Sequence, residues 1–337
     1  MTMTEERKIL AVLSREEKND FLPGQLWQTV SSLPGFKWLK TPLPDEAAWE
    51  QELLSFQPEI IMGCWDIPAL PASLRGKLAL RYYCNLGGGV RKIPIEYLDD
   101  GLLVTNWGKV ISPTIAESAL LLILMCLRRA THWTLKMHVE RTWKDGLLSY
   151  NESLIGKRVG LHGLGASSRA LVPMLKPFTT HLAAYSPSVP ATLFAELGVR
   201  RAASLEELFS GSDVLVELAA ATPKNYHIVD EKLLRMLPEG ATFVNVGRGN
   251  VVDEAALARI AGEGRLQVGL DVYEKEPLPG DSPFRGLSNV NLFPHMGGPT
   301  VDRRQDAGRA AVDNLLKYLA GQPLDFVVTR EIYERST

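Results

Sequence analysis

The sequence predicts an α/β protein with two domains, each built on a parallel sheet, and three observations indicate this fold class. First, 337 residues exceed what one hydrophobic core usually serves. Second, short apolar runs alternate with helical patterns along most of the chain, as in parallel sheets covered by helices. Third, a glycine turn, Gly163-Leu164-Gly165, separates a strand pattern from a helix pattern. We therefore expect a ligand-binding domain around that turn and a smaller domain before it.

The composition excludes several classes of partner. With 45% hydrophobic and 23% charged residues and a net charge of -2, the chain offers no general attraction to nucleic acid or to anionic membranes. The longest apolar run, Ala119–Leu127, is far shorter than the ~20 residues of a membrane span. Residues 1–20 lack a signal peptide's apolar core. Cys64, Cys84 and Cys126 form no CxxC pair, so we expect reduced thiols, a cytoplasmic protein and no metal site.

The first third of the chain predicts a small parallel sheet. Clusters of proline and glycine, such as Thr41-Pro42-Leu43-Pro44, separate its apolar runs. The expected strands are Lys8–Leu13, Glu59–Cys64, Leu78–Cys84 and Leu102–Thr105. A long helix should begin at Pro113, because proline in a first turn followed by Glu117 is a typical helix start.

From residue 156 the alternation becomes regular and predicts a doubly wound sheet, whose ligand would sit at the carboxyl ends of its strands. We expect the chain then to return through a helix, Thr300–Leu319, and an extended segment, Leu324–Val328. The predicted domains are therefore 1–111 with 300–337, and 112–299, with a cleft between. The expected strands are Val159–His162, His181–Tyr185, Val214–Leu218, Thr242–Val246, Gln267–Leu270 and Val290–Leu292, and the helices are Ala166–Leu175, Leu205–Phe209, Glu231–Met236 and Asp253–Glu263.

The glycine turn at the start of this alternation predicts a dinucleotide site. Gly163 and Gly165 permit a tight turn that brings backbone N–H groups to a pyrophosphate at the next helix. Ser168 replaces the third glycine of the usual fingerprint and is small enough to pack there. The following strand ends in Tyr185-Ser186-Pro187, with neither an acid for the ribose hydroxyls nor an arginine for a phosphate. The choice between NAD and NADP therefore stays open.

Three further residue types suit hydride-transfer chemistry. His295 is the candidate acid/base, because imidazole titrates near neutrality. Arg248 is the candidate for binding a substrate carboxylate and polarising a carbonyl, because guanidinium binds in a forked geometry. Each would be weak evidence alone, but their flanking motifs occur in a specific order. These motifs are Gly163-Leu164-Gly165, Asp213-Val214 through Thr222-Pro223, Asn245 to Asp253, Asp271 to Pro277, and Pro294 to Gly298.

With these motifs the chain resembles the D-isomer-specific 2-hydroxyacid dehydrogenases, the group that includes D-3-phosphoglycerate, glyoxylate/hydroxypyruvate and D-lactate enzymes. The resemblance covers nearly the whole chain and is loose before residue 78. It implies two Rossmann-like domains, the doubly wound coenzyme domain being inserted in a smaller flavodoxin-like substrate domain. It also implies NAD(P)-dependent interconversion of a small 2-keto acid and a D-2-hydroxy acid, and a homodimer formed through the coenzyme domain.

The resemblance assigns roles to single residues as well. Glu276 would orient His295, and Asp271 and Val246 would contact the nicotinamide amide. The coenzyme-binding set that it implies is Gly163, Leu164, Gly165, Ala166, Ser167, Ser186, Ala220, Thr222, Val246, Gly247, Arg248, Asp271, His295 and Gly297.

The chain departs from the family pattern at the substrate turn. Gly88 and Gly89 retain backbone amides that can bind a carboxylate. Arg91 and Lys92 stand where the family has an acid and an amide, and our hypothesis is that they favour a doubly anionic substrate. The alternative is that both point to solvent. Trp65 is a candidate wall of the substrate pocket, with ordinary packing as the alternative.

Other departures carry less information. Leu218 and Ala220 replace a histidine and a proline of the family, and residues 131–153 match nothing closely. We interpret the histidines other than His295 as structural or surface residues.

Two other functions are conceivable for a chain with these motifs. A catalytically silent NAD(H)-binding sensor or corepressor-like protein of the same fold is the alternative, although a pure binding module would not require Arg248, Glu276 and His295 together. An L-2-hydroxyacid dehydrogenase is unlike this chain, because its dinucleotide motif starts near the N-terminus. The sequence leaves the keto acid and the physiological direction open.

Overall fold

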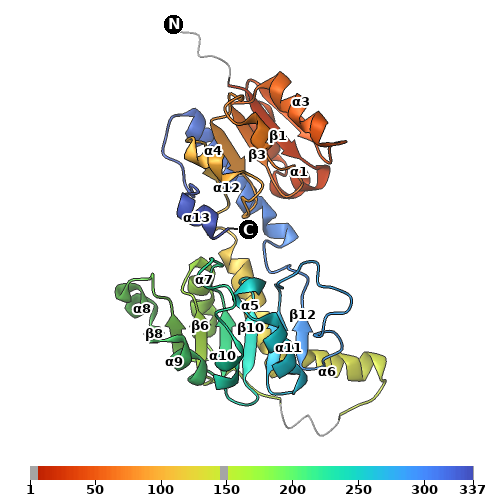
Figure 1. Cartoon of the computed structure of the whole chain (residues 1–337), viewed down its shortest axis with the longest axis vertical. Coiled ribbons are helices and arrows are strands. Elements are labelled where there is room, and N and C mark those ends of the chain that lie inside the picture. The colour runs from red at the N-terminus through yellow and green to blue at the C-terminus, as the bar shows by residue number, and fades with distance from the viewer. Residues whose placement is uncertain (1–6, 145–150, 337) are drawn as a thin grey trace. The chain divides into compact units, whose positions relative to one another are not determined.

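The chain divides into two domains, each with its own parallel sheet (Figure 1). The computed structural model describes residues 7–144 and 151–336. The smaller domain is formed by the chain up to Ile111 and from Pro299 onward, and the larger by Ser112–Gly298. Within the described residues, no helix combines the length and the apolar character that a bilayer span demands.

The smaller domain has a flavodoxin-like sheet with strand order β2-β1-β3-β4-β5, all parallel. Helix α12 returns the chain to this domain and packs against α1, α2 and β4. Gly308 permits the close approach, because a Cβ there would lie 1.6 Å from the carbonyl oxygen of Phe21. The strands are β1 (Ile9–Leu13), β2 (Phe36–Lys40), β3 (Ile60–Gly63), β4 (Tyr82–Asn85) and β5 (Leu103–Thr105), and the helices are α1 (Arg15–Phe21), α2 (Gln25–Ser31), α3 (Glu46–Phe56), α4 (Ile95–Asp99), α12 (Arg304–Leu319) and α13 (Arg330–Glu334).

The strand expected at Leu78–Cys84 begins only at Tyr82. Two further segments of the smaller domain differ from the sequence expectation. Strand β2 was not predicted, because it lies at the sheet edge and is mostly part-exposed, with Lys37 and Lys40 in its run. The segment expected to be extended at Leu324–Val328 forms no strand and makes only an isolated bridge between Val327 and Thr105.

The larger domain is a doubly wound Rossmann sheet with strand order β12-β11-β10-β9-β6-β7-β8, all parallel. One apolar core lies between the sheet and α5, α7 and α8, and the other lies under α9, α10 and α11. The strands are β6 (Val159–His162), β7 (Leu182–Tyr185), β8 (Arg200–Arg201), β9 (Val214–Glu217), β10 (Thr242–Asn245), β11 (Gln267–Leu270) and β12 (Val290–Leu292), and the helices are α5 (Ser112–Leu127), α6 (Ala130–Thr134), α7 (Ala166–Leu175), α8 (Ala191–Leu197), α9 (Leu205–Ser210), α10 (Glu231–Met236) and α11 (Glu254–Gly262).

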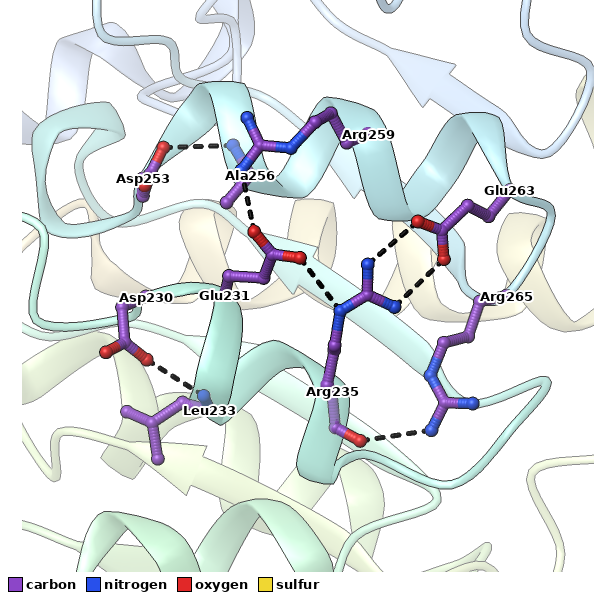
Figure 2. Close-up of polar contacts among 9 residues, drawn as sticks. All are labelled: Asp230, Glu231, Leu233, Arg235, Asp253, Ala256, Arg259, Glu263 and Arg265. Carbon is purple, nitrogen blue, oxygen red and sulfur yellow. Dashed lines mark hydrogen bonds and ion pairs between the residues drawn. The ribbon is translucent and has the colours of Figure 1, made fainter.

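Ion pairs connect the outer surfaces of α10 and α11 (Figure 2). Arg235 of α10 pairs with Glu231 one turn earlier and with Glu263 at the end of α11. Arg259 of α11 also forms an ion pair with Glu231. The first turns of these helices are capped by the side chains of Asp230 and Asp253 (Figure 2). These polar contacts fix the two helices beside each other over the sheet.

The predicted strands of the larger domain are confirmed, each within one residue of its expected bounds. Strand β8 and helix α8 were not predicted. The short β8 has two exposed arginines and no apolar run that would mark it in the sequence. Residues 131–153, which match nothing closely in sequence, contain most of α6 and a π-helical segment, Leu135–Val139. Residues 145–150 of this region lie outside the described residues.

Candidate active site

The glycine turn after β6 has the geometry that a dinucleotide requires. Gly163 has φ of +90°, and a Cβ there would lie 3.0 Å from the backbone of Ala219. Gly165 is the N-cap of α7 and provides no side-chain cap, so the N–H groups of the first turn are open to an anion. Ser168 donates to the carbonyl of Gly163 at 2.8 Å and fixes the turn against the helix. These residues fit the pyrophosphate of NAD or NADP.

The end of β7 does not distinguish the two coenzymes. Ser186 follows the strand and is buried, with no carboxylate beside it in the chain. Among the basic residues of β8, Arg200 pairs with Glu207, and the guanidinium carbon of Arg201 lies 5.5 Å from the ring centre of Phe194. The coenzyme preference is therefore unresolved.

The loop after β9 is held by a residue that the sequence analysis missed. The backbone N–H and the hydroxyl of Thr222 donate to Oδ1 of Asn225 at 2.6 and 2.9 Å. Nδ2 of Asn225 donates to the carbonyl of Ala220 at 2.6 Å. Two of the predicted coenzyme residues are thus positioned by one amide side chain. The only sequence signal for it is an asparagine three residues after Thr222 in a polar loop.

Arg248 lies in a turn that is fixed by the last residue of β10. Asn245 accepts the N–H of Gly247 at 3.0 Å and donates to the carbonyl of Arg248 at 3.1 Å. The guanidinium of Arg248 is largely buried and donates through Nη1 to the carbonyl of Gly247. Its Nε has no hydrogen-bond partner within the described residues. Burial lowers the pKa of Arg248, and the charge of Glu276 opposes this shift.

Gly249 brings this turn against the loop that carries Glu276. A Cβ on Gly249 would lie 1.9 Å from the carbonyl carbon of Tyr273, so no other residue fits without displacing the backbone. The electrostatic effect of Glu276 on Arg248 is a consequence of this close approach.

The imidazole of His295 is hydrogen-bonded to Glu276. Nδ1 of His295 lies 2.6 Å from Oε2 of Glu276, and Oε1 of that carboxylate accepts the N–H of Tyr273 at 3.0 Å. The buried carboxylate of Asp271 accepts the N–H groups of Met296 and Gly297 at 2.8 and 2.9 Å. The loop that follows His295 is therefore anchored to the residue after β11.

The structure brings the three predicted catalytic residues of the larger domain into one cluster. Glu276 bonds to His295 and acts by its charge on Arg248. A pocket of about 650 Å³ adjoins the pair, and it is lined by Tyr273, Glu276, Pro277, Leu278, Arg285, Leu292, Phe293, Pro294 and His295. A guanidinium, a carboxylate and an imidazole in this arrangement can bind an anion, orient a ring and exchange a proton.

The glycine turn of the smaller domain presents free donors. Asn85 donates to the carbonyl of Gly89 at 2.7 Å, and Asn106 donates to that of Gly88 at 2.9 Å. In residues 7–144 and 151–336 the N–H groups of Gly88 and Gly89 have no acceptor. A Cβ on Gly88 would lie 2.4 Å from the indole of Trp107, a residue that the sequence analysis did not single out.

Arg91, Lys92 and Trp65 make contacts within the smaller domain. The guanidinium of Arg91 lies 4.8 Å from the ring centre of Tyr333 and donates to carbonyls of the C-terminal segment. Lys92 donates to the carbonyls of Trp65 and Ile67. These bonds hold both cations within the smaller domain, and the hypothesis of a doubly anionic substrate stays a prediction. The ring of Trp65 is 41% exposed and lies under the guanidinium of Arg304 at 5.0 Å.

One buried pair was not expected from the sequence. His162, taken as structural or surface, bonds through Nδ1 to Oε2 of Glu217 at 2.5 Å. The sequence signal is an ionisable residue, His162 or Glu217, at the end of each of two strands that are otherwise apolar. Among the described residues, no group of three or more His, Cys, Asp or Glu side chains could hold a metal ion.

Comparison with known proteins gives one consistent family. The model of the D-isomer specific 2-hydroxyacid dehydrogenase NAD-binding domain matches residues 120–297. The chain is similar to hydroxyphenylpyruvate reductase of Plectranthus scutellarioides, with 36% identity over 233 residues, which are 68% of this chain and 72% of that protein. It is also similar to glyoxylate/hydroxypyruvate reductase A of Arabidopsis thaliana, with 33% identity over 238 residues, 70% of this chain and 74% of that protein.

A solved structure supports the fold over almost the whole chain. The D-mandelate dehydrogenase of Rhodotorula graminis superposes with a TM-score of 0.83 at 22% identity, covering 96% of this chain and 98% of that chain. At this identity the match concerns the fold alone.

Proposed function

Because the chain belongs to the D-isomer-specific 2-hydroxyacid dehydrogenase family, we propose that it interconverts a 2-keto acid and a D-2-hydroxy acid with NAD(H) or NADP(H). The observation that carries this proposal is the bond between His295 and Glu276 beside the turn of Arg248. A module that only bound a dinucleotide would need none of these three side chains.

In the proposed reaction Arg248, His295 and Glu276 have different roles. Arg248 binds the carboxylate of the keto acid and polarises its carbonyl through its forked donors. His295 transfers a proton to the carbonyl oxygen, and Glu276 orients the ring and stabilises its cationic form. The reduced nicotinamide, when bound, supplies the hydride that goes to the carbonyl carbon. In the opposite direction, His295 takes the proton from the hydroxyl group.

The glycine turn after β6 supports the coenzyme part of the proposal. The uncapped first turn of α7 offers N–H donors to the pyrophosphate, and we propose Gly163, Leu164, Gly165, Ala166 and Ser167 as its binding segment. We keep the other predicted coenzyme residues as candidates. We assign Gly88 and Gly89 to the substrate carboxylate because no acceptor among the described residues engages their N–H groups.

We also propose a homodimer and a cytoplasmic location. Apolar side chains are exposed in the segment after α6, where Met137, Val139 and Trp143 are 44%, 69% and 67% exposed. Such a group of side chains is typical of an interface. Light scattering on the purified protein tests the dimer. The location rests on the three unpaired cysteines.

The experiment is a panel of 2-keto acids, including glyoxylate and hydroxypyruvate, assayed with NADH and with NADPH by the absorbance of the reduced nicotinamide. We expect turnover of at least one keto acid. The His295→Asn variant should lose about 10²- to 10⁴-fold in kcat while still binding coenzyme, because asparagine tolerates the same backbone conformation but cannot transfer the proton. Coenzyme binding without turnover across the panel would instead favour the silent sensor.

A further inference from the structure

Two buried ionisable side chains lie beside the coenzyme turn, outside the residues that the proposed reaction uses. His162 is the last residue of β6 and Glu217 the last residue of β9, and they are partners in the register of these neighbouring strands. His162 is 5% exposed and Glu217 is 0% exposed. Their side chains are joined by the 2.5 Å contact between Nδ1 and Oε2.

The pair lies at the position where doubly wound sheets in general bind a dinucleotide. Strands β7 and β8 extend the sheet on one side of β6, and β9 to β12 extend it on the other. The strand order therefore reverses between β6 and β9. In doubly wound sheets the ligand lies at the carboxyl ends of the two strands that flank such a reversal. The first residue of the coenzyme turn, Gly163, directly follows His162.

Glu217 also holds the segment between two functional turns. Its Oε1 accepts the N–H of Ala219 at 2.8 Å. On one side, a Cβ on Gly163 would lie 3.0 Å from Ala219, and on the other, a Cβ on Gly247 would lie 3.2 Å from the carbonyl oxygen of Glu217. The carboxylate therefore fixes a segment that is wedged between the coenzyme turn and the turn of Arg248.

A carboxylate at this place is costly unless its charge is compensated. A buried ion without a partner loses its hydration, and the pyrophosphate of a dinucleotide, which is itself an anion, would be repelled by it. Burial lowers the pKa of His162, but the charge of Glu217 and the hydrogen bond to it outweigh burial, so that the net shift is upward. The imidazolium form neutralises the carboxylate.

Among the described residues, neither His162 nor Glu217 has another charged side chain as hydrogen-bond or ion-pair partner. Tyr185 of β7 has its ring centre 6.2 Å from that of His162. Asn245, the register partner of Glu217 on β10, is neutral. The charged groups on the adjoining elements are Arg248 after β10, the exposed Arg169 on α7, and Glu206 and Glu207 on α9, of which Glu207 pairs with Arg200.

We propose that His162 is a positioning residue for the coenzyme: its imidazolium cancels the charge of Glu217, so that Glu217 can hold the 217–219 segment without repelling the pyrophosphate. The inference rests on the proposed function, since it requires that the chain bind a dinucleotide. Loss of the His162 proton leaves a buried anion beside the coenzyme turn and weakens coenzyme binding.

The experiment measures the dissociation constant of NADH, or of NADPH if that coenzyme binds more tightly, by its fluorescence between about pH 6 and 9. For the unmutated protein we expect affinity to fall as pH rises. His162→Gln should weaken binding about tenfold or more at neutral pH, because the carboxylate loses its counter-charge. Glu217→Gln keeps an oxygen for the N–H of Ala219 and should bind with an affinity that does not change with pH. The double variant should recover most of the affinity that His162→Gln loses.

Control ligands separate an effect on the pyrophosphate from an effect on the adenosine part of the coenzyme, and a folding measurement accompanies them. ADP, which carries the pyrophosphate, should follow the same pattern as NADH, whereas adenosine should not. Circular dichroism reports whether each variant is folded, and the pH series on the unmutated protein needs no variant. Equal weakening in both single variants and in the double variant would overturn the inference, as would pH-independent binding by the unmutated protein. Absence of any coenzyme binding would instead contradict the proposed function.

Discussion

Nδ1 of His295 lies 2.6 Å from Oε2 of Glu276, whose other oxygen accepts the N–H of Tyr273. The carboxylate is thus fixed by the backbone on one side and orients the imidazole on the other. Because Nδ1 is engaged, Nε2 is the nitrogen left for proton exchange with a substrate. Glu276 orients His295 as the carboxylate of a hydrolase triad orients the histidine that acts as base.

Replacing Glu276 by glutamine should lower kcat about 10²- to 10⁴-fold, because the amide removes the charge that stabilises the cationic ring. Coenzyme affinity should change little. Glu274→Gln is the matched control, since Glu274 bonds to Tyr226 and His227 instead of His295. Steady-state kinetics with the best keto acid checks the prediction, and a loss of equal size in both variants would contradict it.

Replacing Arg248 by lysine should lower kcat/KM for the keto acid about 10- to 100-fold. Lysine keeps the charge but loses the planar fork, and a hydrogen bond to a charged group contributes about 1.5–3 kcal/mol. Arg259→Lys in the surface network of Figure 2 is the control and should have full activity. An unchanged kcat/KM in Arg248→Lys would remove this residue from the substrate site.

Gly249→Ala should destabilise the larger domain by about 3 kcal/mol or more, because its methyl group would overlap the backbone of Tyr273. Gly262→Ala is the control: Gly262 is the last residue of α11, and its added Cβ would have no described atom within 4 Å apart from its chain neighbours and the backbone of its own helix. We expect that variant to be as stable as the unmutated protein, or more stable by up to about 1 kcal/mol. Urea unfolding followed by tryptophan fluorescence measures both, and similar midpoints would show that the loop at Tyr273 can move.

The ion pairs between α10 and α11 should stabilise the fold in a way that depends on pH and salt (Figure 2). Hydrogen bonds to arginines lower the pKa of Glu231 and of Glu263. A carboxylate with a lowered folded-state pKa contributes stability above its unfolded pKa and loses it as pH falls through the folded value. The Tm difference between the unmutated protein and Arg235→Gln should therefore be small at neutral pH, and it should vanish in acid and at high salt. A difference that persists in both conditions would indicate packing of the arginine stem.

The buried pair should give the opposite pH dependence in the absence of coenzyme. The pKa of His162 is raised, so its stabilising contribution is complete below its unfolded value of about 6.5 and is lost as pH rises through the folded value. Unfolding free energies measured across this window should fall with pH in the unmutated protein. Glu217→Gln should abolish most of that slope, and a parallel slope in the variant would assign the effect to other groups.

The strands of the larger domain could be predicted because buried parallel strands are apolar along their whole length and end at glycine or polar turns. Val159–His162 and Gln267–Leu270 have the bounds expected. Strand β2 could not be predicted, since an edge strand needs little apolar sequence and gains its stability from pairing with β1.

Arg248 and His295 were expected from motifs whose order is specific, and the role of Glu276 was implied by the family resemblance. The bond between His295 and Glu276 agrees with the role expected of them, while their part in catalysis stays a prediction. The pairing of His162 with Glu217 was beyond the sequence analysis, because 55 residues separate them and only strand register brings them together. The contact of Trp107 with Gly88 likewise depends on tertiary packing.

The backbone of His295 has φ of +51°, a conformation that costs free energy for a residue with a side chain. It is held there by Asp271, which takes the next two N–H groups. If that aspartate were lost, the loop could relax and turn the imidazole away although the histidine itself remained. A homologue that retains the equivalents of Arg248, Glu276 and His295 can therefore have lost its activity. The residue equivalent to Asp271 should be inspected before such a homologue is counted as an enzyme.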